Sequence, residues 1–190
     1  MEHALGIGPD DKILLYAPTH RDNVGEGFYG LDYKLIRKAL EQRFGGTWKI
    51  VVRLHNRLRK AKIGVGNTLP DYVCDATNYD DMQDLLLCAD AGVTDYSSWI
   101  FDFVLTGRPG FIIQLDAEDF ANARGFYYPI DTTPFPIAAD SREFADNIRA
   151  FDADKYEKDV ERFLKERGCM EDGHAGERIV KHIKGLMKNG

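Results

Sequence analysis

The sequence contains few cysteines and no long apolar run. Cys74, Cys88 and Cys169 are the only cysteines among 190 residues, and they form neither a CxxC pair nor a zinc-ligand spacing. A small, odd number of scattered cysteines is typical of a reducing compartment, so we expect free, buried thiols. No apolar run approaches the roughly 20 residues that cross a bilayer, and the acidic, polar start MEHALGIGPDDK is unlike a signal peptide. We therefore expect a cytoplasmic protein without a transmembrane segment.

Signatures of several enzyme classes are also missing. There is no Walker A loop, no GxGxxG motif and no GxSxG nucleophile elbow. The Asp-rich residues 71–95 lack the residue order and the glycine of an EF-hand. None of the histidines has a partner at metal-ligand spacing; they are His3, His20, His55, His174 and His182. The sequence therefore predicts no metal site and indicates neither a P-loop enzyme nor a serine hydrolase.

Charge is distributed unevenly along the chain. Residues 34–62 contain ten Lys and Arg against one acid, Glu41, which is a net charge of +9. Because the whole chain carries −6, the remaining residues total −15. A local basic block in an acidic protein favours an anionic ligand over nucleic acid, whose binding domains are usually basic throughout. A solvated basic helix face is the alternative for Arg37, Lys38 and Arg43.

Short apolar runs alternate with helical patterns. The expected strands cover residues 12–17, 48–54, 72–75, 91–94 and 110–114. Helices are expected to begin near Asp32, Asp81, Ser98, Asp140 and Asp154, and a last helix carries the apolar residues Ile179, Val180, Ile183, Leu186 and Met187. A hydrophobic content of 44% suffices for one core, without repeat or linker. We predict a single α/β domain over residues 1–190, with a Rossmann-like parallel sheet covered by helices on both faces.

Ligands of such sheets bind outside the carboxyl ends of the strands, so the polar residues that follow each strand are candidates. Thr19, Arg21 and Asp22 follow the first strand, and together they can hold a phosphate or a polar acceptor. Taken alone, a turn with an Arg21–Asp22 ion pair is the favoured interpretation of this segment. His20 between them is interpreted as incidental.

The second strand ends in Arg53 and His55. Strand alternation places both side chains on the same side. Arginine offers a bidentate fork to phosphate, and histidine can donate to an anionic oxygen or shuttle a proton. A structural histidine at a strand end is an equally weighted alternative. The basic connector of residues 56–70 adds positive potential through Arg57, Arg59, Lys60 and Lys62.

Residues 94–103, TDYSSWIFDF, follow the fourth expected strand. Asp95, Ser97 and Ser98 stand where a helix begins, and a helix start both favours such residues as caps and binds anions. A nucleophilic serine is not indicated, because the elbow motif is absent. Asp102 lies one turn after Ser98, and a carboxylate between Phe101 and Phe103 is costly unless it is hydrogen-bonded. We expect Asp102 to hold a loop or the helix end.

Two further segments carry weaker signals. In residues 124–128, RGFYY, Arg124 stands beside a glycine and three aromatic residues, so it either lines a ligand pocket or packs against the sheet. Residues 171–179 are interpreted as the start of the last helix.

Five motifs occur together in order: YAPTHRD at 16–22, RLH at 53–55, TDYSSWIFDF at 94–103, RGFYY at 124–128 and DGHAGERI at 172–179. This set resembles the CDP-glycerol glycerophosphotransferase family, the teichoic-acid primases and polymerases, over nearly the whole chain. The resemblance implies a GT-B fold of two Rossmann-like domains, of which this chain is similar to the C-terminal, nucleotide-binding half. The family's N-terminal acceptor domain, with another catalytic histidine, is not among the 190 residues, so we expect the isolated chain to be inactive.

The resemblance implies an activity and a donor. Glycerol phosphate would be transferred from CDP-glycerol to a hydroxyl of a growing polymer or lipid-linked primer, with release of CMP. By motif, Arg53 and His55 would contact the pyrophosphate, with His55 as the catalytic residue that assists CMP departure. The residues expected to bind or border the donor are Ser97, Ser98, Thr19, Arg21, Asp22, Asp95 and Arg124. No organic cofactor is implied, Mg²⁺ stays open as an ion on the phosphates, and the full-length protein would lie at the inner face of the cell membrane.

Departures from the family pattern leave the polyol open. Asn56 stands where proline usually follows the RxH histidine, Pro129 where Asp often follows RGFYY, and His20 where an aromatic residue is common. Ribitol or another CDP-linked donor is therefore compatible. Two alternative functions are a glycosyltransferase that uses a sugar nucleotide, and a nucleotide-binding half without turnover.

Overall fold

A computed structural model describes residues 5–20, 30–55, 69–117 and 129–188 of the chain. Its centre is a six-stranded sheet in the order β3-β2-β1-β4-β5-β6, and every neighbouring pair is parallel. The strands are β1 (Asp11–Tyr16), β2 (Thr47–Val52), β3 (Val73–Asp75), β4 (Ala91–Thr94), β5 (Gly110–Ile113) and β6 (Ile137–Ala138). This is the strand order of the Rossmann fold, so the predicted fold class is confirmed.

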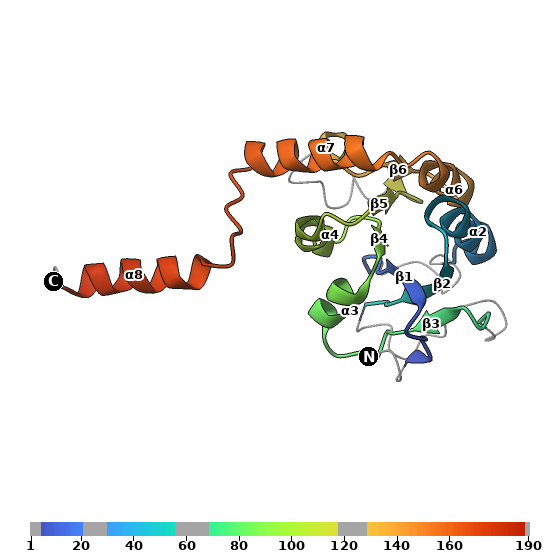
Figure 1. The fold of residues 1–190 in the computed structure, drawn as a ribbon, viewed down its shortest axis with the longest axis horizontal. Helices are drawn as coiled ribbons and strands as arrows, with labels where there is room; N and C mark the ends of the chain where they lie inside the picture. The colour runs from blue at the N-terminus through green and yellow to red at the C-terminus, as the bar shows by residue number, and fades with distance from the viewer. Residues whose placement is uncertain (1–4, 21–29, 56–68, 118–128, 189–190) are drawn as a thin grey trace.

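Helices cover both faces of the sheet. The helices in the described residues are α2 (Tyr33–Phe44), α3 (Met82–Cys88), α4 (Trp99–Phe103), α6 (Ser141–Arg149), α7 (Ala153–Glu166) and α8 (Ala175–Lys188), with short 3₁₀ helices η4 (Val104–Thr106) and η5 (Ile130–Thr132); of these, α8 does not lie on the sheet. Figure 1 shows α2 and α6 on one face and α3 and α4 on the other. This two-sided cover explains why the strand sequences are continuously apolar rather than alternating.

Aspartates begin four of the helices. Asp32, Asp81, Asp140 and Asp152 each accept a hydrogen bond from a backbone N–H of the first turn, at 2.8–2.9 Å. The capping predicted at Asp32 and Asp140 is confirmed, and Glu143 completes the second cap by accepting from the backbone N–H of Ala139 at 2.7 Å. These bonds satisfy backbone donors that a helix start otherwise leaves unpaired.

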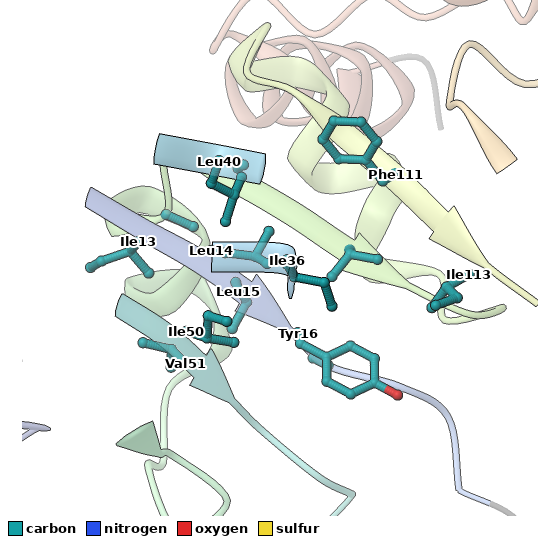
Figure 2. Packing of buried hydrophobic residues seen from close by; sticks show 14 of the residues in the cluster. Ile13, Leu14, Leu15, Tyr16, Ile36, Leu40, Ile50, Val51, Phe111 and Ile113 are labelled. Carbon is teal, nitrogen blue, oxygen red and sulfur yellow. The ribbon is translucent and has the colours of Figure 1, made fainter. Parts of the chain in front are cut away.

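The core lies between the sheet and its helices. The side chains of β1 from Ile13 to Tyr16 are all buried, as are those of Ile50 to Val52 in β2. Figure 2 shows Ile36 and Leu40 of α2 among the side chains of these strands and of β5. Since Ile36 and Leu40 are fully buried, α2 is held against the central strands.

The second strand ends earlier than predicted. The sequence indicated a strand up to Leu54, whereas β2 ends at Val52. The backbone N–H of Arg53 still donates to Tyr16 of β1 at 2.9 Å, but that of Leu54 donates to the hydroxyl of Thr77 at 3.1 Å. The chain therefore leaves the sheet between Arg53 and Leu54.

Two other elements differ from expectation. The helix predicted to begin near Ser98 is divided into the five-residue α4 and the 3₁₀ helix η4. The two-residue strand β6 was not predicted, because so short a segment carries no periodicity that can be recognised.

The prediction of buried thiols is wrong for two cysteines. Cys88 and Cys169 are exposed, and only Cys74 is half-buried. Burial raises the pKa of the Cys74 thiol. All three are free thiols, as expected.

The predicted last helix is present, but its apolar face is not covered. Ile179, Val180, Ile183, Leu186 and Met187 are each at least half exposed. Figure 1 shows α8 beyond the end of α7 and away from the sheet. Among the described residues, no helix combines the length and the apolar character needed to cross a membrane.

Candidate functional site

A cavity of about 280 Å³ lies at the carboxyl ends of the central strands β2, β1 and β4. Its walls come from the segments that follow these strands and from two helices; the lining residues are Ala17, Pro18, Arg53, Leu54, His55, Met82, Ser97, Ser98, Trp99 and Asp102. Strand order reverses between β1 and β4, which is the position where open parallel sheets bind ligands.

The segment after β2 supplies the basic wall. Arg53 and His55 both line the cavity, while Leu54 between them is 4% exposed and packs in the core. Arg53 is half-buried as a residue, and its guanidinium donates through Nη2 to the carbonyl of Asp80 at 3.2 Å in a bond that is exposed to solvent. This bond holds one end of the guanidinium fork beside the cavity.

The segment after β4 supplies the hydroxyls. Ser97 and Ser98 line the cavity, and Ser98 immediately precedes α4. Its side chain makes no capping hydrogen bond, and its backbone is already helical (φ −65°, ψ −17°). The capping interpretation is therefore wrong for Ser98. Because α4 has only five residues, its dipole contributes little positive potential at the cavity, so the guanidinium of Arg53 is the main source of positive charge among the described lining residues.

Asp95 has a different environment from the serines beside it. Its side chain is 5% exposed, and its carboxylate accepts from the Thr19 backbone N–H at 2.8 Å and from the Thr19 hydroxyl at 2.7 Å. The backbone N–H of Tyr96 donates to it as well, at 2.5 Å. These contacts tie the segment after β1 to the segment after β4, so Thr19 and Asp95 shape the site rather than line the cavity.

A second link strengthens this connection. The carbonyl of Ala17 accepts from the Thr94 hydroxyl at 2.8 Å and from the indole Nε1 of Trp99 at 2.7 Å. Trp99 is itself buried and makes an edge contact with Phe103. The position of α4 relative to β1 is therefore set by hydrogen bonds and by packing.

Asp102 adds a carboxylate to the cavity. It is exposed and lines the cavity, so the burial cost that its aromatic neighbours suggested does not arise. Phe101 and Phe103 point elsewhere: Phe103 is fully buried, and Phe101 stacks on Phe163 of α7 at 6.0 Å. The cavity thus has a basic wall after β2 and an acidic group on α4.

His20 was missed by sequence reasoning. Its ring stacks on the ring of His55, with centroids 5.5 Å apart and an interplanar angle of 27°. The sequence contains no signal for this contact, because the two residues follow different strands and meet only when β1 and β2 pair.

The remaining residues that the sequence analysis singled out lie either outside the described residues or away from the cavity. Arg21, Asp22, Arg124 and the basic connector through residue 68 lie outside the described residues. Residues 171–179 do begin the last helix: the backbone N–H of His174 donates to Asp172 at 2.9 Å, and Arg178 pairs with the same carboxylate at 2.6 Å. In the part of the chain that the structure describes, no three His, Cys, Asp or Glu side chains are grouped to hold a metal ion.

Comparison with known proteins identifies the family. Residues 1–185 match the family model described as CDP-Glycerol:Poly(glycerophosphate) glycerophosphotransferase. A teichoic acid glycerol-phosphate transferase of Staphylococcus aureus is 34% identical over 94% of this chain and 46% of its own length. A teichoic acid ribitol-phosphate primase of Bacillus spizizenii is 31% identical over 94% of this chain and 45% of its own length.

Solved structures agree with this result. The wall teichoic acid polymerase TagF superimposes with a TM-score of 0.73 at 27% identity, over 99% of this chain and 46% of the TagF chain. The chain thus spans about half the length of the relatives that it matches. The match over almost all of its residues shows that this chain belongs to the CDP-glycerol:poly(glycerophosphate) glycerophosphotransferase family.

Proposed function

We propose that this chain is the nucleotide-binding part of an enzyme that transfers glycerol phosphate from CDP-glycerol to a hydroxyl of a teichoic-acid-like polymer, with release of CMP. The observation that carries this proposal is the cavity at the β1–β4 reversal, where Arg53, His55, Ser97 and Ser98 surround one space. A guanidinium and hydroxyl groups are suited to the oxygens of a pyrophosphate.

The residues of the cavity fit a positioning role in phosphoryl transfer. The acceptor oxygen forms a bond to the phosphorus that carries glycerol, the bond from this phosphorus to the bridging oxygen breaks, and CMP leaves with the electron pair. Arg53 and the serines would stabilise charge on the phosphate oxygens, and His55 would donate a proton or a hydrogen bond to departing CMP. The proton of the acceptor hydroxyl passes to a base on the acceptor side.

Glycerol is the polyol that we propose. A relative named as a glycerol-phosphate transferase is 34% identical, and a form of TagF that was soaked with CDPG superimposes with a TM-score of 0.71 at 26% identity. Ribitol is the competing polyol, because a ribitol-phosphate primase is 31% identical. The binding experiment below therefore includes both donors.

We further propose that a second domain supplies the acceptor side and its base. The relatives are about twice as long as the region matched by this chain. The exposed apolar face of α8 also supports the proposal, because a soluble domain rarely leaves five large apolar side chains of one helix without a covering surface. The isolated chain is then expected to bind the donor without turnover.

The cellular setting is proposed on the same basis. The acceptor would be a polyol-phosphate polymer or a lipid-linked primer, and the complete enzyme would work peripherally at the inner face of the cell membrane. We propose no organic cofactor, and retain Mg²⁺ as an ion that neutralises donor phosphates. Loss of donor binding on adding EDTA, restored by Mg²⁺, would assign that role to the ion.

A sugar-nucleotide glycosyltransferase is not favoured. The family match and the relatives named above are all polyol-phosphate transferases, primases or polymerases by name. Binding of a UDP-sugar in preference to CDP-glycerol would reverse this assignment.

Calorimetry with CDP-glycerol, CDP-ribitol, CMP and UDP tests the proposed function. We expect CDP compounds to bind more tightly than UDP. Arg53→Ala should weaken CDP-glycerol binding roughly 10- to 100-fold, the range for a lost charged hydrogen bond, and Ser98→Ala about two- to tenfold. Both variants should keep their melting temperature to within a few degrees, because the bond from Arg53 to Asp80 is exposed to solvent and Ser98 makes no cap.

Arg37→Ala is the matched control. Arg37 lies on α2, where it pairs with Glu41 at 2.8 Å and covers the ring of Tyr72. Removing it takes away the same charge without touching the cavity, so donor affinity should stay within about twofold. A folded protein that binds no CDP compound would overturn the proposed function.

A further inference from the structure

His20 and His55 form a stacked pair beside the cavity. Their ring centroids are 5.5 Å apart and the rings are inclined by 27°, which is an offset-stacked arrangement. His55 lines the cavity and is exposed, whereas His20 is half-buried behind it. One face of the His55 ring is therefore occupied by His20.

The position of His20 is fixed by the residue before it. Both hydrogen-bond donors of Thr19, its backbone N–H and its hydroxyl, donate to the two oxygens of the Asp95 carboxylate, at 2.8 and 2.7 Å. Asp95 is almost completely buried, so the carboxylate has little freedom to move. A chain of contacts thus runs from β4 through Asp95 and Thr19 to His20, and from His20 to His55.

The side chain of His55 is less restrained by the sheet than a side chain within a strand is. It stands three residues beyond the end of β2, and its side chain is exposed. An exposed side chain at a strand end samples several rotamers. Binding a ligand in one orientation restricts the imidazole to one of them, and this loss of rotamer freedom weakens binding. A ring stacked against it removes part of that freedom before the ligand arrives.

We propose that His20 is a positioning residue: its ring, held by the Thr19–Asp95 hydrogen bonds, orients the imidazole of His55 toward the phosphates of the bound donor. This inference rests on the proposed function for the identity of the ligand. The stack itself does not depend on that function, because it is a contact between two side chains of this chain.

The first test measures the stack in the free protein. Imidazole ¹H–¹⁵N spectra of the 190-residue chain are compared for wild type, His20→Ala and His20→Phe, with His55→Ala used to assign the His55 signals. Because a neighbouring ring shifts resonances through its ring current, His20→Ala should move the His55 signals, and Thr19→Val should move them in the same direction. The signals of His182 on α8 and of His174 just before this helix are the internal control and should stay in place.

The second test measures what the stack does for binding. His20→Ala should weaken CDP-glycerol binding roughly three- to tenfold, the range expected from losing one aromatic pair. His20→Phe should restore the affinity to within about twofold of wild type, because it keeps a flat ring without the imidazole nitrogens. In a His55→Ala background, His20→Ala should cause no further loss.

The outcomes of these tests distinguish positioning of His55 by His20 from direct ligand binding by His20. An equal loss of affinity in the presence and absence of His55 would overturn a positioning role through His55. Failure of His20→Phe to restore binding would mean that His20 itself binds the ligand, and would overturn it too. A wild-type protein that binds no CDP compound would overturn the proposed function, whereas unchanged His55 signals in His20→Ala would overturn the positioning role alone.

Discussion

At the scale of single residues, Asp95 and Asp102 show how differently two carboxylates of one motif can be used. Asp95 is buried and accepts hydrogen bonds from the Thr19 backbone N–H and hydroxyl and from the Tyr96 backbone N–H, which offset the cost of removing its charge from water. Asp102 is exposed on the cavity wall. The Asp95 carboxylate therefore holds the segments around the cavity in place, whereas the Asp102 carboxylate is accessible from the cavity.

Tyr33 gives a prediction about stability in alkali. Burial raises the pKa of this side chain to about 12, with the Asp75 carboxylate adding to the increase. An unfolded tyrosine ionises near pH 10, so the folded state binds the proton more tightly. The contribution of this proton to the free energy of unfolding is complete below pH 10 and is lost as pH rises toward 12. At pH 11 the loss amounts to about 1.4 kcal/mol.

Urea unfolding of wild type and Tyr33→Phe at pH 7, 9 and 11 measures this contribution. The difference in unfolding free energy between the two proteins should be the same at pH 7 and 9. At pH 11 it should shift by about 1.4 kcal/mol in favour of Tyr33→Phe, because phenylalanine does not ionise. A constant difference across all three pH values would contradict the assignment.

At the scale of elements, the contact between β4 and α4 determines where the cavity wall lies. Gly92 is in the middle of β4, and a Cβ added there would lie 3.0 Å from the rings of both Trp99 and Phe103. Both rings are buried, and Trp99 is further held by its bond to Ala17. The strand needs glycine at this position because α4 packs directly on its backbone.

Gly92→Ala should therefore destabilise the chain by about 1–3 kcal/mol, the usual range for overpacking a well-filled core. It should also weaken donor binding, because a shift of α4 moves Ser97 and Ser98. Thermal unfolding and calorimetry measure the two effects. Gly176→Ala on α8 is the matched control: no atom lies within 4 Å of the added Cβ, so the melting temperature should not fall. Equal melting temperatures for Gly92→Ala and wild type would contradict the packing argument.

The elements and the candidate site were predictable to different extents. The short apolar runs and the aspartate caps are local signals, so β1, β4 and the starts of α2 and α6 were predicted within a residue or two. Arg53, His55, Ser97 and Ser98 meet at one cavity because parallel strands bring their carboxyl ends together. The Thr19–Asp95 bonds and the His20–His55 stack depend on how neighbouring loops pack, which no periodicity encodes. For the same reason, the exposure of Asp102 and of the α8 apolar face could not be predicted.

At the scale of the whole molecule, α8 is separable from the rest. Ile183 is 50% exposed on this helix, whereas Ile148 on α6 is fully buried. Ile183→Glu should leave the melting temperature unchanged within about 1 °C, because little apolar area is lost from water on folding. The same substitution should reduce self-association, since it interrupts an uncovered apolar stripe.

Sedimentation velocity and thermal unfolding test this separation. Ile148→Glu is the contrasting variant, and it should prevent folding, because it places an unpaired charge in the core. A large fall in melting temperature for Ile183→Glu would show that α8 packs on the domain. An unchanged sedimentation coefficient for both wild type and Ile183→Glu at all concentrations would show that the stripe does not drive association.

The Thr19–Asp95 hydrogen bonds have a consequence for how the chain acquires its function. They join residues 76 positions apart in the sequence, across the central pair of parallel strands. Contacts of such long range form late, after the intervening chain has lost most of its freedom. During synthesis, a chain that has not yet delivered β4 has neither the serines nor the carboxylate that holds Thr19, so the cavity proposed for the donor is incomplete. On the proposed function, donor binding would report completed folding, and folding intermediates are predicted not to bind the donor.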